Sequence, residues 1–175
     1  EFSELLKELK CFNLETLKTE YLKKEELEFS YRKSKNLDNK IILSATLIVE
    51  EGDKKIIDQN LSDFNNKRKK SQPAAIYNAG SVFKNTKDYY AGELIDNAGL
   101  KGYEIDGVSV SEKHANFFVA QKGAKAISLF ELVQYVKDKV STKFGIVLEE
   151  EIIFIGDFTK WVSCYMQNKN RLNLL

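Results

Sequence analysis

The run from Ile41 to Val49 constrains the fold more than any other part of the sequence. Its residues, Ile-Ile-Leu-Ser-Ala-Thr-Leu-Ile-Val, are largely β-branched and almost continuously apolar, and Glu50 ends the run. Such a run is typical of a strand that is buried on both faces. We therefore expect a covered strand here, in a chain whose 175 residues are enough for a substantial core.

The composition excludes several classes of protein. Apolar residues make up 43% and charged residues 30%, which indicates a globular chain. Lysine and arginine total 27 against 26 acidic residues, so there is no positive excess for nucleic acid. No apolar run approaches the ~18–20 residues that span a membrane, and the first residues do not resemble a signal peptide. Cys11 and Cys164 form neither a disulfide framework nor a metal quartet, so we expect a soluble, cytoplasmic protein without a metal site.

The first part of the chain predicts short elements and one polar helix. Residues 3–10 have the spacing of an amphipathic helix, residues 11–14 resemble a strand, and residues 27–31 alternate as a strand does. Residues 58–71 are polar and compatible with a helix. We place a domain boundary near Lys54.

The second part is richer in turn signals. The expected elements are a tight turn at 78–81, a helix at 90–98 capped by a glycine, a hairpin turning at Asp106-Gly107, a strand at 117–119, a helix at 129–143 and a strand at 146–155. Ser128 and Glu131 have the spacing of a capping box for the longer helix. These elements predict a mixture of helices and strands.

Two candidate sites stand out from the residues alone. Ser81 directly follows Gly80, where backbone and hydroxyl can approach a ligand closely, although an ordinary turn is the preferred interpretation. The triplet Glu149-Glu150-Glu151 interrupts an apolar stretch, and buried carboxylates tend to be functional. Strand alternation puts a carboxylate on each face, so it does not choose which glutamate is buried, and an exposed stretch remains the alternative.

Other motifs are weaker. His114 is the only histidine and is more simply a structural residue, since no second histidine or suitably placed cysteine completes a zinc site. The basic run 67–70 could contact phosphate, but such a run is usually a solvated helix face. Neither common glycine-rich nucleotide loop is present, and no nucleophile elbow surrounds Ser81.

Seven short motifs follow one another along the chain. They are Tyr31-Arg32-x-Ser34, Gln72-Pro73, Ala79-Gly80-Ser81-Val82-Phe83-Lys84, Ala91-Gly92-x-Leu94-Ile95, Gly99-Leu100-Lys101-Gly102, Val110-Ser111-Glu112-Lys113-His114-Ala115 and Lys143-Phe144-Gly145. In this order the motifs resemble the family of UDP-N-acetylenolpyruvoylglucosamine reductases (MurB), and the likeness covers about residues 25 to 156. The short segment between Arg32 and Pro73 resembles the subtype without an inserted loop in the substrate domain.

The resemblance implies a function and a set of roles. Family members use NADPH to reduce FAD, which then gives a hydride to the enolpyruvyl group of a UDP-sugar in cell-wall precursor synthesis. The match implies Ser81 as proton donor, Arg32 as the group that stabilises the enolate, and Glu151 as the catalytic carboxylate. Lys84 and His114 fall at positions that resemble the substrate-contacting ones.

The sequence also departs from the family pattern. Glu150 and Ile153 replace a proline and an arginine of the family segment Leu-Glu-Pro-Glu-Val-Arg, and Ser71 stands where relatives often have lysine. The family's glycine-rich loop for the FAD diphosphate is absent from this sequence. The chain thus resembles a C-terminal portion that lacks the N-terminal part of the FAD-binding domain, and by itself we expect it to be inactive.

The resulting expectation is an α+β architecture. Residues 1–54 resemble the end of an FAD-binding domain, 55–156 a substrate domain with a mixed or antiparallel sheet and packed helices, and 157–175 a tail. The expected function is reduction of UDP-N-acetylenolpyruvoylglucosamine with FAD and NADPH, without nucleic acid or membrane as partner. The alternative is a UDP-sugar-binding module or fragment without catalytic activity, because the flavin site is incomplete.

Overall fold

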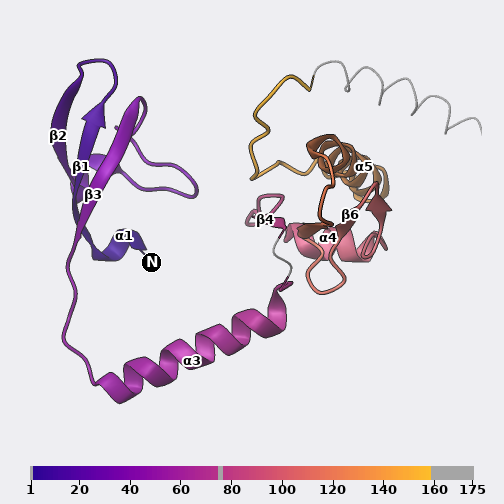
Figure 1. The fold of residues 1–175 in the computed structure, drawn as a ribbon, viewed down its shortest axis with the longest axis horizontal. Helices are drawn as coiled ribbons and strands as arrows, with labels where there is room; N and C mark the ends of the chain where they lie inside the picture. The colour runs from indigo at the N-terminus through magenta and orange to yellow at the C-terminus, as the bar shows by residue number, and fades with distance from the viewer. Residues whose placement is uncertain (1, 75–76, 159–175) are drawn as a thin grey trace, which may run out of the picture. The chain divides into compact units, whose positions relative to one another are not determined.

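The computed structural model describes residues 2–74 and 77–158, which fall into two compact units (Figure 1). The first unit contains residues 1–59 and the second residues 60–175. Each unit has a hydrophobic core of its own. Trp161, Tyr165 and Leu172, which belong to the predicted tail, lie outside the described residues.

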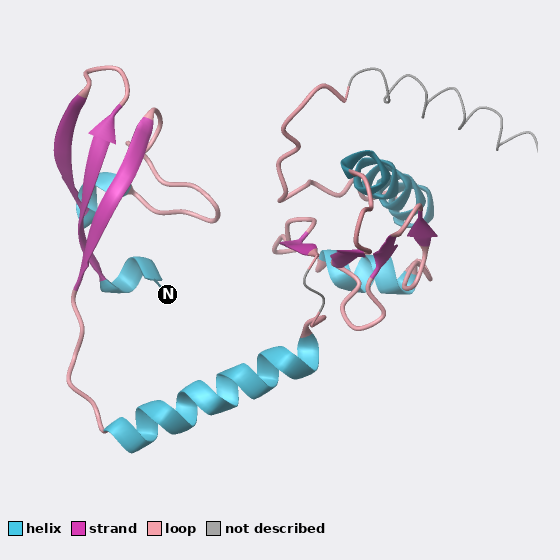
Figure 2. Cartoon of the chain, in the orientation of Figure 1, coloured by secondary structure: helices cyan, strands magenta, loops and turns pink. Residues whose placement is uncertain are grey.

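The first unit is built around a small antiparallel sheet (Figure 2). Its elements in chain order are α1 (Phe2–Leu5), β1 (Leu6–Asn13), β2 (Lys18–Lys23), α2 (Lys24–Leu27) and β3 (Lys40–Leu47). β1 lies between β2 and β3 and pairs with both. The core consists of Leu6, Leu9, Cys11, Leu22 and Leu27, all from β1, β2 and α2.

Two predictions in this unit are wrong. The expected helix at 3–10 is helical only over α1, because β1 begins at Leu6. A register shift near Leu6 and Glu8 breaks the alternation of β1, so that Leu6 and Leu9 are both buried at a spacing that also suits a helix. The expected strand at 27–31 is instead the end of α2 and a turn, since Glu28 adopts a left-handed conformation with φ of 38°.

The strand predicted at 41–49 is confirmed as β3, but its predicted burial is wrong. Ile41, Ile42 and Leu43 expose 51%, 52% and 53% of their surface, and no β3 side chain joins the buried cluster. β3 lies at the edge of the three-stranded sheet, and the core of the unit is formed by the other elements. The described residues therefore leave an apolar strand uncovered.

Helix α3 (Lys54–Ser71) confirms the predicted polar helix and begins four residues earlier than expected. The Asp53 carboxylate accepts the backbone N–H of Lys55 at 2.7 Å, which caps the first turn. The helix buries no residue. Ile57, Leu61 and Phe64 form an exposed apolar stripe along it.

The second unit combines a four-stranded antiparallel sheet with two helices. Its elements are β4 (Asn78–Ser81), α4 (Ala91–Asn97), β5 (Glu104–Ile105), β6 (Val108–Val110), β7 (Phe117–Ala120) and α5 (Ala126–Phe144), with the strand order β4-β7-β6-β5. The core joins side chains from the sheet and both helices, among them Ile95, Val110, Phe118, Leu132 and Val136. The predicted α+β class is confirmed, and both sheets are antiparallel.

Most elements predicted in this unit are present. The hairpin turns at Asp106 and Gly107, whose φ angles of 42° and 79° are the positive values that a type I′ turn requires. Helices α4 and α5 cover the predicted ranges closely, and Gly145 ends α5 with a φ of 70°.

Three local predictions in this unit are wrong. The expected turn at 78–81 is strand β4. The expected strand at 146–155 makes only one isolated bridge, between Phe83 and Glu150. The predicted capping box is absent, because α5 begins earlier, after Lys125, and no side chain caps it; Ser128 is buried within its first turn.

None of the helices in the described part of the chain combines the length and the apolar character that a membrane-spanning helix needs.

Candidate functional site

Ser81 is the last residue of β4 and is half-buried. It pairs with Phe117 of β7, and the register shifts between Asn78 and Ser81. The preceding Gly80 has a φ of 76°, a conformation that side chains rarely adopt. An added Cβ at Gly80 would meet no atom within 4 Å, so the glycine is needed for its backbone angle and not for space. The strand therefore kinks immediately before Ser81.

Asn116 fixes the backbone that follows Ser81. Its side chain is buried and bonds the same residue twice: it accepts the N–H of Phe83 at 2.9 Å and donates to the Phe83 carbonyl at 2.8 Å. Its own carbonyl accepts the N–H of Val82 at 2.9 Å. A buried amide with these partners specifies one position for the segment.

The segment that contains Glu151 pairs with the same stretch. The Glu151 N–H donates to the Val82 carbonyl at 2.8 Å, and the Lys84 N–H donates to the Glu149 carbonyl at 2.9 Å. The structure thus brings the backbone of Glu151 beside the residue next to Ser81. Ser81 and Glu151 are both half-buried.

Lys84 is half-buried, and its ammonium group forms an ion pair with the carboxylate of Glu149. The carboxylate is more exposed than the lysine. An anionic ligand that approaches Lys84 would compete with Glu149 for the ammonium group.

His114 lies in the turn that leads into β7. Its Nδ1 accepts the N–H of Asn116 at 3.2 Å, so in the neutral ring the proton is on Nε2, which can donate to a ligand. The ring packs against Phe117, with centroids 4.9 Å apart. A Cβ at Gly92 of α4 would come within 3.3 Å of the ring, which explains a glycine inside that helix.

A polar cavity of about 660 Å³ lies beside β4 in the second unit. Its lining includes Arg68 and Lys69 from α3, Gly80 from β4 and Phe117 from β7. The Lys113 ammonium also donates to the Lys69 carbonyl. Two residues of the basic run 67–70 therefore line this cavity, while the whole run is exposed, as the predicted solvated face requires.

Comparison with known proteins identifies the family. Residues 72–155 match the family model "UDP-N-acetylenolpyruvoylglucosamine reductase, C-terminal domain". The UDP-N-acetylenolpyruvoylglucosamine reductase of Caldicellulosiruptor bescii is 38% identical over 90% of this chain and 51% of its own length. That of Fervidobacterium nodosum is 44% identical over 75% of this chain and 43% of its own length.

The solved structure of UDP-N-acetylenolpyruvylglucosamine reductase (MurB) from Thermus caldophilus matches with a TM-score of 0.73 and 32% identity. The match covers 85% of this chain and 53% of that chain. The chain contains the C-terminal domain of the UDP-N-acetylenolpyruvoylglucosamine reductase family. It spans about half the length of the curated relatives that it matches.

Arg32, the other catalytic residue implied by the reductase family, belongs to the first unit. It lies in a tight turn closed by two backbone hydrogen bonds between Ser30 and Lys33, at 2.9 and 3.1 Å. Its φ of 59° is strained for a side chain of this size. The guanidinium lies over the Tyr31 ring, 5.3 Å from its centroid. The convergence of Arg32 with Ser81 and Glu151 stays a prediction.

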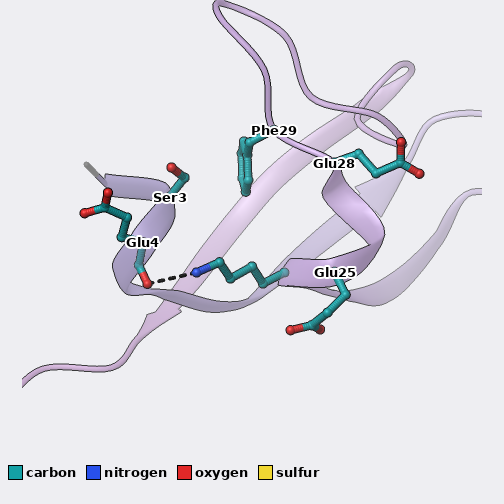
Figure 3. A pocket seen from close by; sticks show the side chains of 6 residues that line it. Ser3, Glu4, Glu25, Glu28 and Phe29 are labelled. Carbon is teal, nitrogen blue, oxygen red and sulfur yellow. Dashed lines mark hydrogen bonds between the residues drawn. The ribbon is translucent and has the colours of Figure 1, made fainter.

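The first unit also contains a small pocket, lined by Ser3, Glu4, Lys24, Glu25, Glu28 and Phe29 (Figure 3). Its volume is about 300 Å³, and the Lys24 ammonium donates to the Glu4 carbonyl at 3.0 Å. Three carboxylates make it unsuited to the diphosphate of FAD, and it contains no predicted site residue. This pocket therefore does not fit the flavin of the reductase family.

Asn116, which holds the backbone beside the candidate site, is a residue that the sequence reasoning did not single out. It lies two positions after His114, directly after a motif that carried the resemblance, but nothing in the local pattern shows a contact with Phe83, which is 33 positions away.

Within the described residues, no group of three or more His, Cys, Asp or Glu side chains could hold a metal ion.

Proposed function

We propose that a full-length protein containing this chain reduces the enolpyruvyl group of UDP-N-acetylenolpyruvoylglucosamine to a lactyl group in peptidoglycan precursor synthesis. In this proposal FAD and NADPH are the cofactors and the protein works in the cytoplasm. The observation that carries it is the pairing of the Glu149–Glu151 segment with the stretch directly after Ser81, inside a domain that matches the family's C-terminal domain.

Ser81, Arg32 and Glu151 have complementary roles in the proposed reaction. When a hydride is added at the terminal methylene carbon, the electrons of the double bond move toward the substrate carboxylate and form an enolate. The Arg32 guanidinium stabilises this charge as a fixed, planar cation. Ser81 then gives its hydroxyl proton to the other carbon of the former double bond. Glu151 is the catalytic carboxylate that the family resemblance assigns to this site.

Lys84 and His114 contact the sugar or the diphosphate of the substrate. The ion pair of Lys84 with Glu149 holds its ammonium group close to the Ser81 segment, and the Nε2 proton of His114 can donate to an oxygen. The cavity beside β4 supports a diphosphate ligand, because Arg68 and Lys69 in its lining carry positive charge.

The flavin must be held largely by a part of the protein that these residues do not form. The exposed apolar side chains of β3 support this assignment, because an uncovered apolar strand is typical of a surface that docks another layer. The N-terminal part of the FAD-binding domain is the partner that we propose for this surface. The residues of this chain are therefore assigned only two steps, the stabilisation of the enolate charge and the transfer of the proton.

The decisive experiment is Ser81→Ala in the full-length protein, with Ser109→Ala on β6 of the same sheet as matched control. Rapid-mixing absorbance follows the two half-reactions separately. We expect reduction of FAD by NADPH to stay near normal, and its reoxidation by the enolpyruvyl substrate to slow by about 10²–10⁴-fold, the usual contribution of a positioned acid.

Equal slowing of both half-reactions in Ser81→Ala would contradict the proton-donor role. A full-length protein that binds the UDP-sugar but is colourless and does not oxidise NADPH would be a binding module without catalytic activity, which would refute the proposed function.

A further inference from the structure

The segment from Gly145 to Phe158, which carries Glu151, has no regular secondary structure. Three backbone hydrogen bonds attach it to the residues that follow Ser81, and two of these bonds form the bridge between Phe83 and Glu150. A segment with so few backbone bonds needs side-chain contacts to define its position.

Glu150 provides such a contact with helix α5. Its carboxylate accepts a hydrogen bond from the Lys137 ammonium at 2.7 Å, and the two side chains are only 23% and 26% exposed. Lys137 directly follows Val136, which is fully buried in the core, so its backbone is held firmly. An ion pair that is largely removed from water is screened less than a surface pair, and loss of one partner leaves a poorly solvated charge.

A proline at position 150 would limit the backbone through its fixed φ angle. A glutamate imposes no such limit. Lys137 constrains the same position from outside the segment, through a side chain on a packed helix.

We propose that Lys137 is a positioning residue for Glu151, acting through its ion pair with Glu150; this inference rests on the proposed function for the catalytic meaning of Glu151. The pair fixes Glu150 against α5, and the bridge from Glu150 to Phe83 then sets the backbone of Glu151 against Val82. Lys137 itself contacts neither substrate nor cofactor in this proposal.

Amide hydrogen exchange of the 175-residue chain tests the proposal without substrate, cofactor or activity. In Lys137→Met we expect the Glu151 amide to exchange about tenfold faster, the factor that corresponds to about 1.4 kcal/mol. The Val110 amide, which donates to Tyr103 elsewhere in the unit, should change by less than about twofold. Lys139→Met is the matched control on the same helix, since the Lys139 ammonium lies over the Tyr135 ring.

The charge-swapped double variant, Lys137→Glu with Glu150→Lys, should restore slow exchange of the Glu151 amide. Unchanged exchange in Lys137→Met would overturn the proposal. So would equal acceleration of the Glu151 and Val110 amides, which would mean a general loss of stability, or failure of the swap to restore slow exchange.

Steady-state kinetics of the full-length protein test whether Lys137 matters for catalysis. Lys137→Met should lower kcat with little change in KM, and the swap should restore kcat; a normal kcat in Lys137→Met would overturn the catalytic part. If the exchange results hold and Ser81→Ala slows both half-reactions equally, the proposed function fails while Lys137 keeps its structural role.

Discussion

Strand β3 of the first unit is more apolar than its exposure suggests, whereas the shorter strands of the second unit have buried side chains. β3 is a long, almost uninterrupted apolar strand, yet its side chains are largely exposed. The strands of the second unit are shorter, yet Val108, Val110 and Phe118 are buried because α4 and α5 join their core. The contrast shows that the burial of a strand depends on the layers that cover it, and its own sequence indicates only that it needs such layers.

Matched leucine substitutions test this contrast and should have the largest effect. Leu132→Ala removes a fully buried side chain from α5, so the free energy of unfolding of the second unit should fall by about 2–5 kcal/mol. Leu43→Ala on the half-exposed β3 should cost the first unit less than about 1 kcal/mol. Amide hydrogen exchange reports the stability of each unit separately.

Equal losses for the two leucine variants would break the contrast, since they would mean that β3 is covered in solution. In a full-length family protein the cost of Leu43→Ala should rise toward that of Leu132→Ala, if the proposed docking of the FAD-binding part is correct.

A second pair of variants compares polar groups in the two units. Asn116→Ala leaves the buried N–H and carbonyl of Phe83 without partners, which should cost about 2–4 kcal/mol. Asn13→Ala removes hydrogen bonds to the N–H groups of Glu15 and Thr16 at an exposed turn, where water replaces them, and should cost less than about 1 kcal/mol. Urea denaturation followed by circular dichroism measures both; similar costs would show that burial does not set the value of these bonds.

The smallest effect concerns Glu131 of α5. Burial, followed by the negative charge of Asp106, raises the pKa of this carboxyl above its ordinary value of 4.5. The folded state therefore holds the proton more tightly, and stability falls as the pH rises from about 4.5 through the raised pKa. Glu131→Gln should leave stability unchanged at acid pH and raise it at neutral pH by less than about 0.5 kcal/mol.

Thermal unfolding at a series of pH values measures the effect of Glu131→Gln. The gain should shrink in an Asp106→Asn background, because the second charge is removed and asparagine followed by glycine suits the same turn. A gain that is as large at acid pH as at neutral pH would rule out ionisation of Glu131 as its cause.

The fold was predictable from sequence where the local signal agreed with the tertiary contacts. Asp106-Gly107 specifies its hairpin and Gly145 ends its helix. Both features depend on positive φ angles at these same residues, which glycine adopts readily and which a local sequence pattern can therefore indicate. The predictions failed where partners distant in sequence decide the structure. The stretch around Leu6 and Leu9 suits a helix, but pairing of β1 on both sides makes it a bulged strand.

The candidate site follows the same rule. Ser81 is a candidate from sequence because it follows a glycine, although an ordinary turn is the preferred interpretation of that motif. The family resemblance, and not strand alternation, selects Glu151, and the roles of both residues stay predictions. The sequence could not show that Asn116 bonds Phe83, or that Glu150 meets Lys137, since each contact joins segments that only the tertiary fold brings together.

The buried amide of Asn116 has a consequence for how this site can change. Its side chain fixes the residue before Lys84, while its backbone N–H fixes the ring of His114. A shift of the backbone at one of these positions is therefore transmitted to the other through Asn116. A redesign of ligand preference at this site would therefore have to vary positions 84 and 114 together.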